Sequence, residues 1–197
     1  MAKGYAKSKI SDEASYQTKL EVTQRYLEPH MEVLEFGCGT GSTAIVQAPF
    51  VKCLVGIDIS DKMLEIARTK TEVTGLNNLS FERSNLEDYQ TADGTWDVIM
   101  GHSILHLLED KDATIARVFQ LLKPGGVFVS STICIGEMNI AFRVLAPVLS
   151  FVRLIPVLQA FSKSELETSI TDAGFEIDHN WQPKKGAAVF IVAKKPV

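Results

Sequence analysis

Short runs of β-branched and other apolar residues alternate along the chain with segments whose apolar positions recur at helical spacing. Five such runs predict strands, at 33–36, 51–57, 79–82, 96–100 and 126–131. Alternation of this kind is typical of an α/β fold, in which helices cover both faces of a mainly parallel sheet. The pattern therefore predicts a three-layer sandwich formed by residues 1–197 as a single domain.

Capping residues and prolines place the ends of the predicted helices. An N-terminal helical arm, residues 1–30, has Ser11 as a candidate N-cap and Pro29 as its end. The glycine-rich segment after the first strand predicts a short helix over 41–48, stopped by Pro49.

The C-terminal region predicts a helix followed by a β-hairpin. Ser162 and Glu165 have the spacing of a capping box, which opens a helix running to Ala173. Apolar and polar residues then alternate over 175–182, and a four-residue link leads into a last strand at 188–193. So short a link joins neighbouring strands antiparallel, because a parallel return needs about a dozen residues or more. We expect a seven-stranded, mostly parallel sheet with one antiparallel strand near the C-terminus.

Composition and charge narrow the classes of partner. The chain of 197 residues is 46% hydrophobic, as in ordinary globular proteins, and its 20 basic and 24 acidic residues give a net charge of −4. This balance disfavours nucleic acid as a partner, because a phosphate backbone is held by an excess of basic residues. The three cysteines are far apart and lack metal-ligand spacing, so no metal site is predicted. The cysteine pattern and a polar N-terminus that lacks the apolar core of a signal peptide together predict a cytoplasmic protein.

The segment 137–161 is an apolar insert after the fifth strand. Its apolar residues are interrupted by Arg143, Arg153 and two prolines, which argues against a transmembrane span. Such a segment suits a lid over an apolar acceptor, a homodimer contact or peripheral contact with a membrane surface. Simple packing over the sheet is the alternative.

The most specific chemical signal is VLEFGCGTGSTA, residues 33–44, which joins a buried strand, a glycine-rich loop and a helix start. Glycines let the backbone approach a ligand closely, and the free N–H groups of a helix start favour a negatively charged group. The second strand ends at Asp58, whose carboxylate can accept hydrogen bonds from both hydroxyls of a ribose. Together these features predict a nucleotide-like ligand.

Two cofactors fit this arrangement, depending on the frame in which the loop is read. From Gly39, the sequence GTGSTA matches the dinucleotide fingerprint G-x-G-x-x-A. From Glu35, the sequence EFGCGTG resembles the first motif of the class I S-adenosylmethionine (SAM)-dependent methyltransferases. The segments 55–60 and 96–99 resemble further motifs of that family, and LLKPGG at 121–126 is similar to its turn before strand five. The resemblance is closest to the small-molecule branch that includes ubiquinone and menaquinone biosynthesis methyltransferases, and it implies their Rossmann-like fold.

The resemblance also implies which residues hold SAM and its product S-adenosylhomocysteine (SAH). Glu35 and the backbone of Gly37, Cys38 and Gly39 would hold the methionine part, and Asp58 the ribose. The adenine would contact four further residues, namely Ile59, Met63, Leu86 and Asn85. The family usually has an aspartate at the position of Asn85, whose amide oxygen can still accept from the adenine amino group. For Met63 and Leu86, packing in the core is an equal alternative.

Methyl transfer needs alignment of a nucleophile with the sulfonium methyl group and exclusion of water, so a dedicated base is optional. His102, followed by Ser103, is expected just beyond the fourth strand beside the cofactor, and His102 is the candidate base or orienting group. His106 is predicted to be a packed, hydrogen-bonded histidine and not a metal ligand, because no third ligand accompanies it and His102. The resemblance also implies that Tyr16, in the arm, reaches the amino acid end of the cofactor, with a surface or helix-staple role as an equal alternative.

The predicted function is methyl transfer from SAM to a small, hydrophobic acceptor molecule. One alternative is an NAD(P)-dependent oxidoreductase, although its Tyr-x-x-x-Lys pattern occurs here only on the wrong side of the glycine loop. A second alternative is a non-catalytic scaffold that keeps the SAM-binding site.

Overall fold

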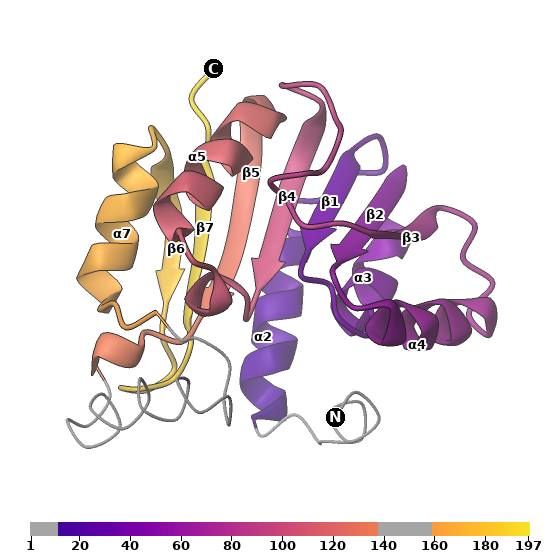
Figure 1. Ribbon diagram of the computed structural model, residues 1–197, viewed down its shortest axis with the longest axis horizontal. Helices are drawn as coiled ribbons and strands as arrows, with labels where there is room; N and C mark the ends of the chain where they lie inside the picture. The colour runs from indigo at the N-terminus through magenta and orange to yellow at the C-terminus, as the bar shows by residue number, and fades with distance from the viewer. Residues whose placement is uncertain (1–11, 138–158) are drawn as a thin grey trace.

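The computed structural model describes residues 12–137 and 159–197, and a sheet of seven strands forms its centre (Figure 1). The strands are β1 (Glu32–Phe36), β2 (Cys53–Asp58), β3 (Leu79–Arg83), β4 (Trp96–His102), β5 (Leu122–Thr132), β6 (Glu176–Trp181) and β7 (Val189–Lys194). Their order across the sheet is β3-β2-β1-β4-β5-β7-β6. β7 pairs antiparallel with both β5 and β6, whereas β1 to β5 pair in parallel. The predicted mostly parallel sheet with one reversed strand is confirmed.

Helices cover both faces of this sheet, and Figure 1 shows α5 and α7 in front of it and α2 behind it. One face carries α2 (Glu13–Gln24), α3 (Ser42–Gln47) and α4 (Asp61–Glu72), and the other carries α5 (Lys111–Leu121) and α7 (Lys163–Asp172). Three short 3-10 turns complete the described elements, namely η1 (Ala48–Phe50), η2 (Leu105–Leu107) and η3 (Ile135–Glu137). The arrangement is the three-layer sandwich expected from the sequence.

Two hydrophobic cores lie on opposite faces of the central strands. Leu34 of β1 packs with α5 and α7, and its neighbour Val33 packs toward α2, α3 and α4. Both side chains are fully buried. Successive side chains of a strand point to opposite faces, so a strand that is covered on both faces must be apolar at nearly every position. This explains why the central strands appear in the sequence as continuous apolar runs.

The strand order reverses direction at β1. From β1 the chain adds β2 and β3 on one side, and it then returns to add β4 and β5 on the other. In open α/β sheets, the carboxyl ends of the strands on either side of such a reversal form a crevice that binds ligands. The fold therefore places a candidate site at the carboxyl ends of β1 and β4.

The structure corrects both predicted ends of the first helix. Asp12 is the N-cap of α2, and its side chain accepts a hydrogen bond from the N–H of Ser15. Ser11, the predicted cap, lies outside the described residues. The helix ends at Gln24 and not at Pro29, because the backbone changes to i→i−3 hydrogen bonds beyond this point.

The fourth strand is longer than predicted. β4 continues past Met100 to His102, because β5 runs alongside it and pairs Ser131 with His102. His102 therefore belongs to the strand and not to the loop beyond it. The turn expected over 121–126 lies within β5 from Leu122 onward, where the pairing register shifts.

The short helix 41–48 also differs from its prediction. Pro49 does not end the helical path, because α3 gives way at Gln47 to η1, which holds Pro49 in its first turn. Proline is tolerated there, since the first N–H groups of a helix have no partner within it.

Most of the apolar insert, residues 138–158, lies outside the described part of the chain, so the predicted lid, dimer contact and membrane contact lie there too. Its flanks are described and adjacent, since the N–H of Gly136 donates to the carbonyl of Phe161 over 2.9 Å. Within residues 12–137 and 159–197, none of the helices combines the length and apolar character needed to cross a membrane.

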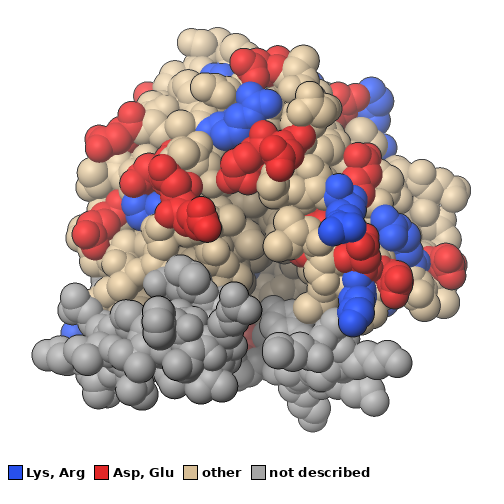
Figure 2. All heavy atoms as spheres, viewed as in Figure 1, with Lys and Arg blue, Asp and Glu red and all other residues tan. Residues whose placement is uncertain are grey.

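Charged side chains of both signs cover the α5 and α7 face. Figure 2 shows acidic groups interspersed with basic ones over this face, and its basic groups do not merge into one continuous patch.

Candidate active site

The loop after β1 carries three glycines in the left-handed backbone region. φ is +64° at Gly37, +53° at Gly39 and +68° at Gly41. A Cβ at Gly37 would lie 2.7 Å from Ile104 Cγ1, and one at Gly41 would lie 2.6 Å from Phe81 Cζ, so tight packing also requires glycine at these two positions. A Cβ at Gly39 would meet nothing within 4 Å. Gly39 thus faces open space in which a ligand can approach the backbone.

Asp58, the last residue of β2, ties this loop to the start of α4. One carboxylate oxygen, Oδ2, accepts from the N–H of Gly39 over 2.9 Å, and Oδ1 accepts from the N–H of Ser60 over 2.8 Å. Each oxygen of a carboxylate can accept about two hydrogen bonds, so both keep capacity for a ligand hydroxyl. The carboxylate therefore holds the loop in place and remains available to a diol.

Glu35, His102 and Ser131 lie on three neighbouring strands, β1, β4 and β5, and face α2. Glu35 pairs with Met100, two residues before His102, and His102 pairs with Ser131. Met100 belongs to the core cluster that includes Val22 of α2, and side chains two apart on a strand share a face. We call Glu35, His102 and Ser131 the polar row.

The first two members of the polar row form a buried, incompletely bonded pair. Glu35 is only 2% exposed, and its Oε1 lies 3.5 Å from Nδ1 of His102. Within the described part of the chain, neither Oε2 of Glu35 nor Nδ1 of His102 has a hydrogen-bond partner. A buried carboxylate is costly without partners, so a cationic or hydrogen-bond-donating group fits beside Oε2.

Two residues of α2, Tyr16 and Lys19, lie against the polar row on the face of the sheet that α2 covers. They are three positions apart and so lie on one helix face. Burial raises the pKa of the Tyr16 phenol, and the nearby charge of Glu35 adds to the effect, whereas a hydrogen bond with Thr43 opposes it. Lys19 donates from Nζ to Oγ of Ser131 over 2.8 Å, and burial lowers its pKa.

A cleft of about 700 Å³ opens between α2, the glycine loop, the ends of β4 and β5, and the turn between β6 and β7. It brings together seven predicted site residues, namely Tyr16, Glu35, Gly37, Cys38, Gly39, His102 and Ser103. Burial raises the pKa of the Cys38 thiol far above its ordinary range, and the charges of Glu35 and Asp58 add to the effect. Cys38 therefore stays a neutral thiol, and its N–H donates to the carbonyl of Ile57 over 3.0 Å.

The five residues predicted on the ribose and adenine side do not line this cleft. Asp58 borders it through its bond to Gly39, and Ile59 is 69% exposed. Met63 is half-buried. Leu86 is 3% exposed, and its side chain packs in the core with α5, which is the alternative that the sequence left open.

The side-chain amide of Asn85 is hydrogen-bonded to Asp88. Its Oδ1 accepts from the N–H of Asp88 over 2.7 Å, and its Nδ2 donates to Oδ2 of Asp88 over 2.9 Å. The amide oxygen, which was expected to serve the adenine, is thus already used once, and contact with adenine stays a prediction.

Ser103 has φ of 56°, which places a non-glycine residue in the left-handed region. Its N–H donates to the carbonyl of Ser131 over 2.7 Å, and the following residue, Ile104, lies against Gly37. Such strain is found most often at functional sites, where the surrounding contacts maintain it. Here it directs the chain from β4 back toward the glycine loop.

His106 is buried in η2 and does not line the cleft. Burial lowers its pKa, and Nδ1 has no hydrogen-bond partner in the described part of the chain. The packed position agrees with the prediction, but the expected hydrogen bond at this nitrogen is not found. Over residues 12–137 and 159–197, no cluster of three or more His, Cys, Asp or Glu side chains could hold a metal ion.

Sequence reasoning missed Lys19, Ser131 and Lys70. From α4, the ammonium of Lys70 donates to the hydroxyls of Thr40 and Ser42, each over 2.9 Å, and so fixes the far end of the glycine loop. A usable signal existed for Lys19, which follows Tyr16 at helical spacing. Lys70 and Ser131 gave none, because their roles depend on contacts between distant segments.

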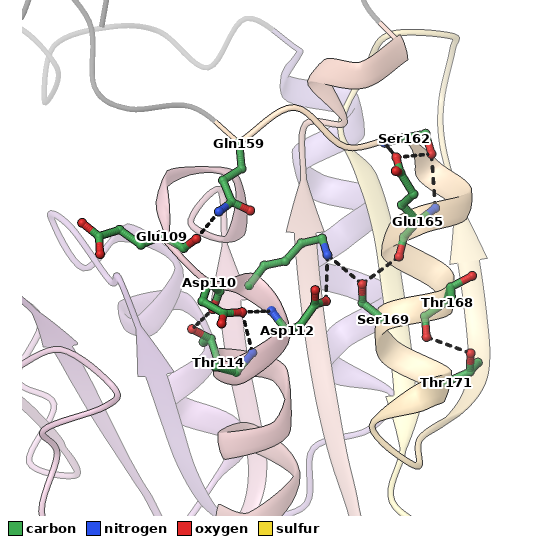
Figure 3. A network of polar contacts seen from close by, with 12 residues as sticks. Glu109, Asp110, Asp112, Thr114, Gln159, Ser162, Glu165, Thr168, Ser169 and Thr171 are labelled. Atoms are coloured by element: carbon green, nitrogen blue, oxygen red, sulfur yellow. Dashed lines mark hydrogen bonds and ion pairs between the residues drawn. The ribbon is translucent and has the colours of Figure 1, made fainter. Parts of the chain in front are cut away.

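A second cavity of about 700 Å³ lies between α5 and α7, on the other face of the sheet. Figure 3 shows that its polar groups bond to one another: the ammonium of Lys111 donates to Asp112 over 2.7 Å and to Ser169 over 2.8 Å. Ser162 and Glu165 form the predicted capping box at its rim. These contacts join two helices, and we place no chemistry there.

Comparisons with known proteins agree with this geometry. A family model described as a methyltransferase domain matches residues 27–183. The chain is 33% identical over 105 residues to an arsenite methyltransferase of Aquipseudomonas alcaligenes, covering 48% of this chain and 30% of that protein. It is 34% identical over 103 residues to a ubiquinone biosynthesis O-methyltransferase of Thiobacillus denitrificans, covering 52% and 44%. The chain thus spans less than half the length of these two curated relatives.

Among solved structures, a SAM-dependent methyltransferase of Methanosarcina mazei superposes with a TM-score of 0.74 at 21% identity, over 89% of this chain and 97% of that one. At this identity the likeness shows a shared fold. Fold, glycine loop and acidic strand end together are those of the class I, Rossmann-like SAM-dependent methyltransferase domains. The chain belongs to the methyltransferase domain family, as its match over residues 27–183 shows.

Proposed function

We propose that this chain transfers a methyl group from SAM to a small, hydrophobic acceptor molecule. The observation that carries the proposal is the buried carboxylate of Glu35, a residue that lines the cleft beside the glycine loop and whose Oε2 has no hydrogen-bond partner in the described part of the chain. A buried carboxylate oxygen that can still accept a hydrogen bond suits the ammonium group of an amino acid, which SAM has and NAD(P) lacks. The family match supports the same choice over the oxidoreductase.

Residues of the cleft and others outside it would together hold SAM along its length. Glu35 would pair with its ammonium group, and the open backbone at Gly39 leaves room for the chain that leads to the ribose. Asp58 would accept from the ribose hydroxyls with the lone pairs that Gly39 and Ser60 leave free. Tyr16 would contact the amino acid end, because it lies above Glu35. Ile59, Met63, Asn85 and Leu86 remain the candidates for the adenine side.

His102 is the proposed base or orienting group. It lies between Glu35, on the cofactor side, and Ser131, on the side of β5. SAM supplies an activated methyl group, so the chain must align the acceptor, exclude water and take up a proton if the acceptor loses one. An imidazole beside a buried carboxylate suits that last task, because the carboxylate stabilises the imidazolium that forms. Ser103 would hold His102 in position through its bond to β5.

The hydrophobic character of the acceptor rests on the walls beyond His102. Ile133 is 36% exposed and lines the cleft together with Ala187 and Ala188 of the turn between β6 and β7. An apolar acceptor would bury these surfaces and displace water from the reacting atoms.

Ligand-dependent stability tests the cofactor first. SAM and SAH should raise the thermal unfolding midpoint of the purified chain, and NAD(P)H should not, because a ligand that binds only the folded state stabilises it by mass action. A rise with NAD(P)H alone would contradict the proposal. A library of phenols, amines, thiols and quinone-like acceptors, assayed with labelled SAM, then tests methyl transfer, and SAH binding without transfer to any of them would favour the scaffold.

Two variants test the assigned roles. Asp58→Ala should weaken SAM binding about tenfold or more, since it removes charge-assisted hydrogen bonds. Exposed Asp61, which pairs with Arg83 at the start of α4, offers the control Asp61→Ala with unchanged affinity. His102→Ala should lower kcat more than cofactor affinity, and equal turnover at saturating acceptor would show that His102 is not the base.

A further inference from the structure

Lys19 is a lysine of the proposed active site whose ammonium group is hydrogen-bonded to a hydroxyl and not to a carboxylate. Its Nζ donates to the hydroxyl of Ser131, and no carboxylate in residues 12–137 and 159–197 forms an ion pair with it. The side chain is half-buried and lines the cleft. Burial lowers the pKa of the Lys19 ammonium group, because a charged group loses hydration when it is buried. A bound anion would offset this cost.

Two carboxylates and a second lysine also line the cleft. The carboxylate of Asp12 interacts electrostatically with Lys19. Its two oxygens accept hydrogen bonds from Ser15, one from the N–H over 3.1 Å and one from the hydroxyl over 2.7 Å. Glu35 faces His102. Lys184, from the turn between β6 and β7, adds a second positive charge to the same cleft. Lys19 and Lys184 thus bring two positive charges to the side of the cleft formed by α2 and this turn, where Asp12 is the acidic side chain that interacts with both.

The position of Lys19 indicates which ligand would meet it. Its partner Ser131 lies on β5, and β4 separates β5 from β1, whose end carries the glycine loop. The ammonium group thus lies beyond His102 as seen from the glycine loop. This is the side on which the proposed function places the methyl acceptor.

We infer that Lys19 and Ser131 form a subsite for a carboxylate group on the methyl acceptor. The inference rests on the proposed function and narrows its acceptor class to apolar molecules that carry an acidic group. Lys19 supplies the charge, and the hydroxyl of Ser131 can turn to donate a second hydrogen bond, since a serine hydroxyl both donates and accepts. Ile133 and the alanines of the turn between β6 and β7 contact the apolar body of the same molecule.

Matched acid and amide probes test this subsite on the SAH complex. The wild-type chain, saturated with SAH, is titrated calorimetrically with benzoate and 3-phenylpropionate and with their uncharged amides. Each acid should bind about tenfold more tightly than its amide, as expected for a charge-assisted hydrogen bond. The preference should vanish in Lys19→Met and persist in Lys19→Arg. It should also persist in the control Lys62→Met, which changes an exposed lysine of α4.

Three results would contradict the inference, and they differ in whether the proposed function fails with it. A wild-type chain that binds no SAH refutes the proposed function, and the subsite with it, before any probe is added. Normal SAH binding with no preference for acids, or with no binding of any probe, overturns the subsite alone. Loss of SAH affinity in Lys19→Met, with a normal unfolding midpoint, also overturns it, because the ammonium group would then serve the carboxylate of the cofactor.

Discussion

Gly37→Ala and Gly39→Ala should separate the structural and ligand-binding roles of the glycine loop. Both residues have positive φ, +64° and +53°, but their surroundings differ. A Cβ at Gly37 would lie 2.7, 2.8 and 3.1 Å from three side-chain atoms of Ile104, and a Cβ at Gly39 would face open space. The first substitution should therefore destabilise the fold, and the second should obstruct the cofactor.

The expected magnitudes follow from these contacts. A left-handed conformation costs alanine about 1–2 kcal/mol, of which about 0.4–1 kcal/mol is offset because alanine restricts the unfolded chain. Gly39→Ala should thus lower the free energy of unfolding by about 1 kcal/mol. Gly37→Ala adds overpacking of about 1–3 kcal/mol, for a total of about 2–4 kcal/mol. At about 2–4 °C per kcal/mol for a chain of this size, its Tm should fall by about 4–16 °C.

Urea unfolding and SAH calorimetry on the same variants measure both effects. Gly39→Ala should weaken SAH binding about tenfold or more while the fold stays intact, because its Cβ enters the space of the ligand. For Gly37→Ala, the double variant with Ile104→Ala should be about 1–3 kcal/mol more stable than the sum of the two single changes predicts, because the smaller side chain relieves the clash.

Two results would refute this reasoning. If Gly39→Ala destabilised the chain as much as Gly37→Ala, the contact with Ile104 would not be the cause. If Gly39→Ala left SAH affinity unchanged, the open space at Gly39 would not be the cofactor path.

Other predictions address separate contacts. Lys70→Met should weaken SAH binding about threefold to tenfold by releasing the glycine loop, with exposed Lys62→Met as the control, and equal calorimetric affinities would contradict this role. Burial and the bond to Asp178 raise the pKa of Tyr26 to about 12 from 10.0, so the stability that this tyrosine contributes below pH 10 should be lost as pH rises to about 12. Tyr26→Phe should reduce this loss in urea unfolding, and an identical pH profile would refute it. Ser162→Ala should cost about 0.5–2 kcal/mol of stability by removing the capping box of α7, and SAH affinity serves as the readout that should not change.

The sequence alone was sufficient for the architecture, because the signals that specify it are local. Apolar runs, capping residues and glycines act within a few neighbouring positions, so β1, the glycine loop and Asp58 could be assigned in order along the chain. The reversed strand β7 followed from the length of the link before it, which is too short for a parallel return. The end of β4 was misplaced because it depends on pairing with β5, a distant segment.

Within the candidate site, the sequence determined the residue types at the loop and at the strand ends, and the tertiary structure decided which of them meet. The pairing register of β1, β4 and β5 places Glu35 beside His102 and His102 beside Ser131, and the packing of α2 brings Lys19 to that row. On the opposite face of the sheet, packing with α5 places Leu86 in the core, whereas Ile59 is left exposed. Such contacts join segments up to 112 positions apart, and the spacing of residues along a chain carries no information about them until the strands are aligned and the helices docked.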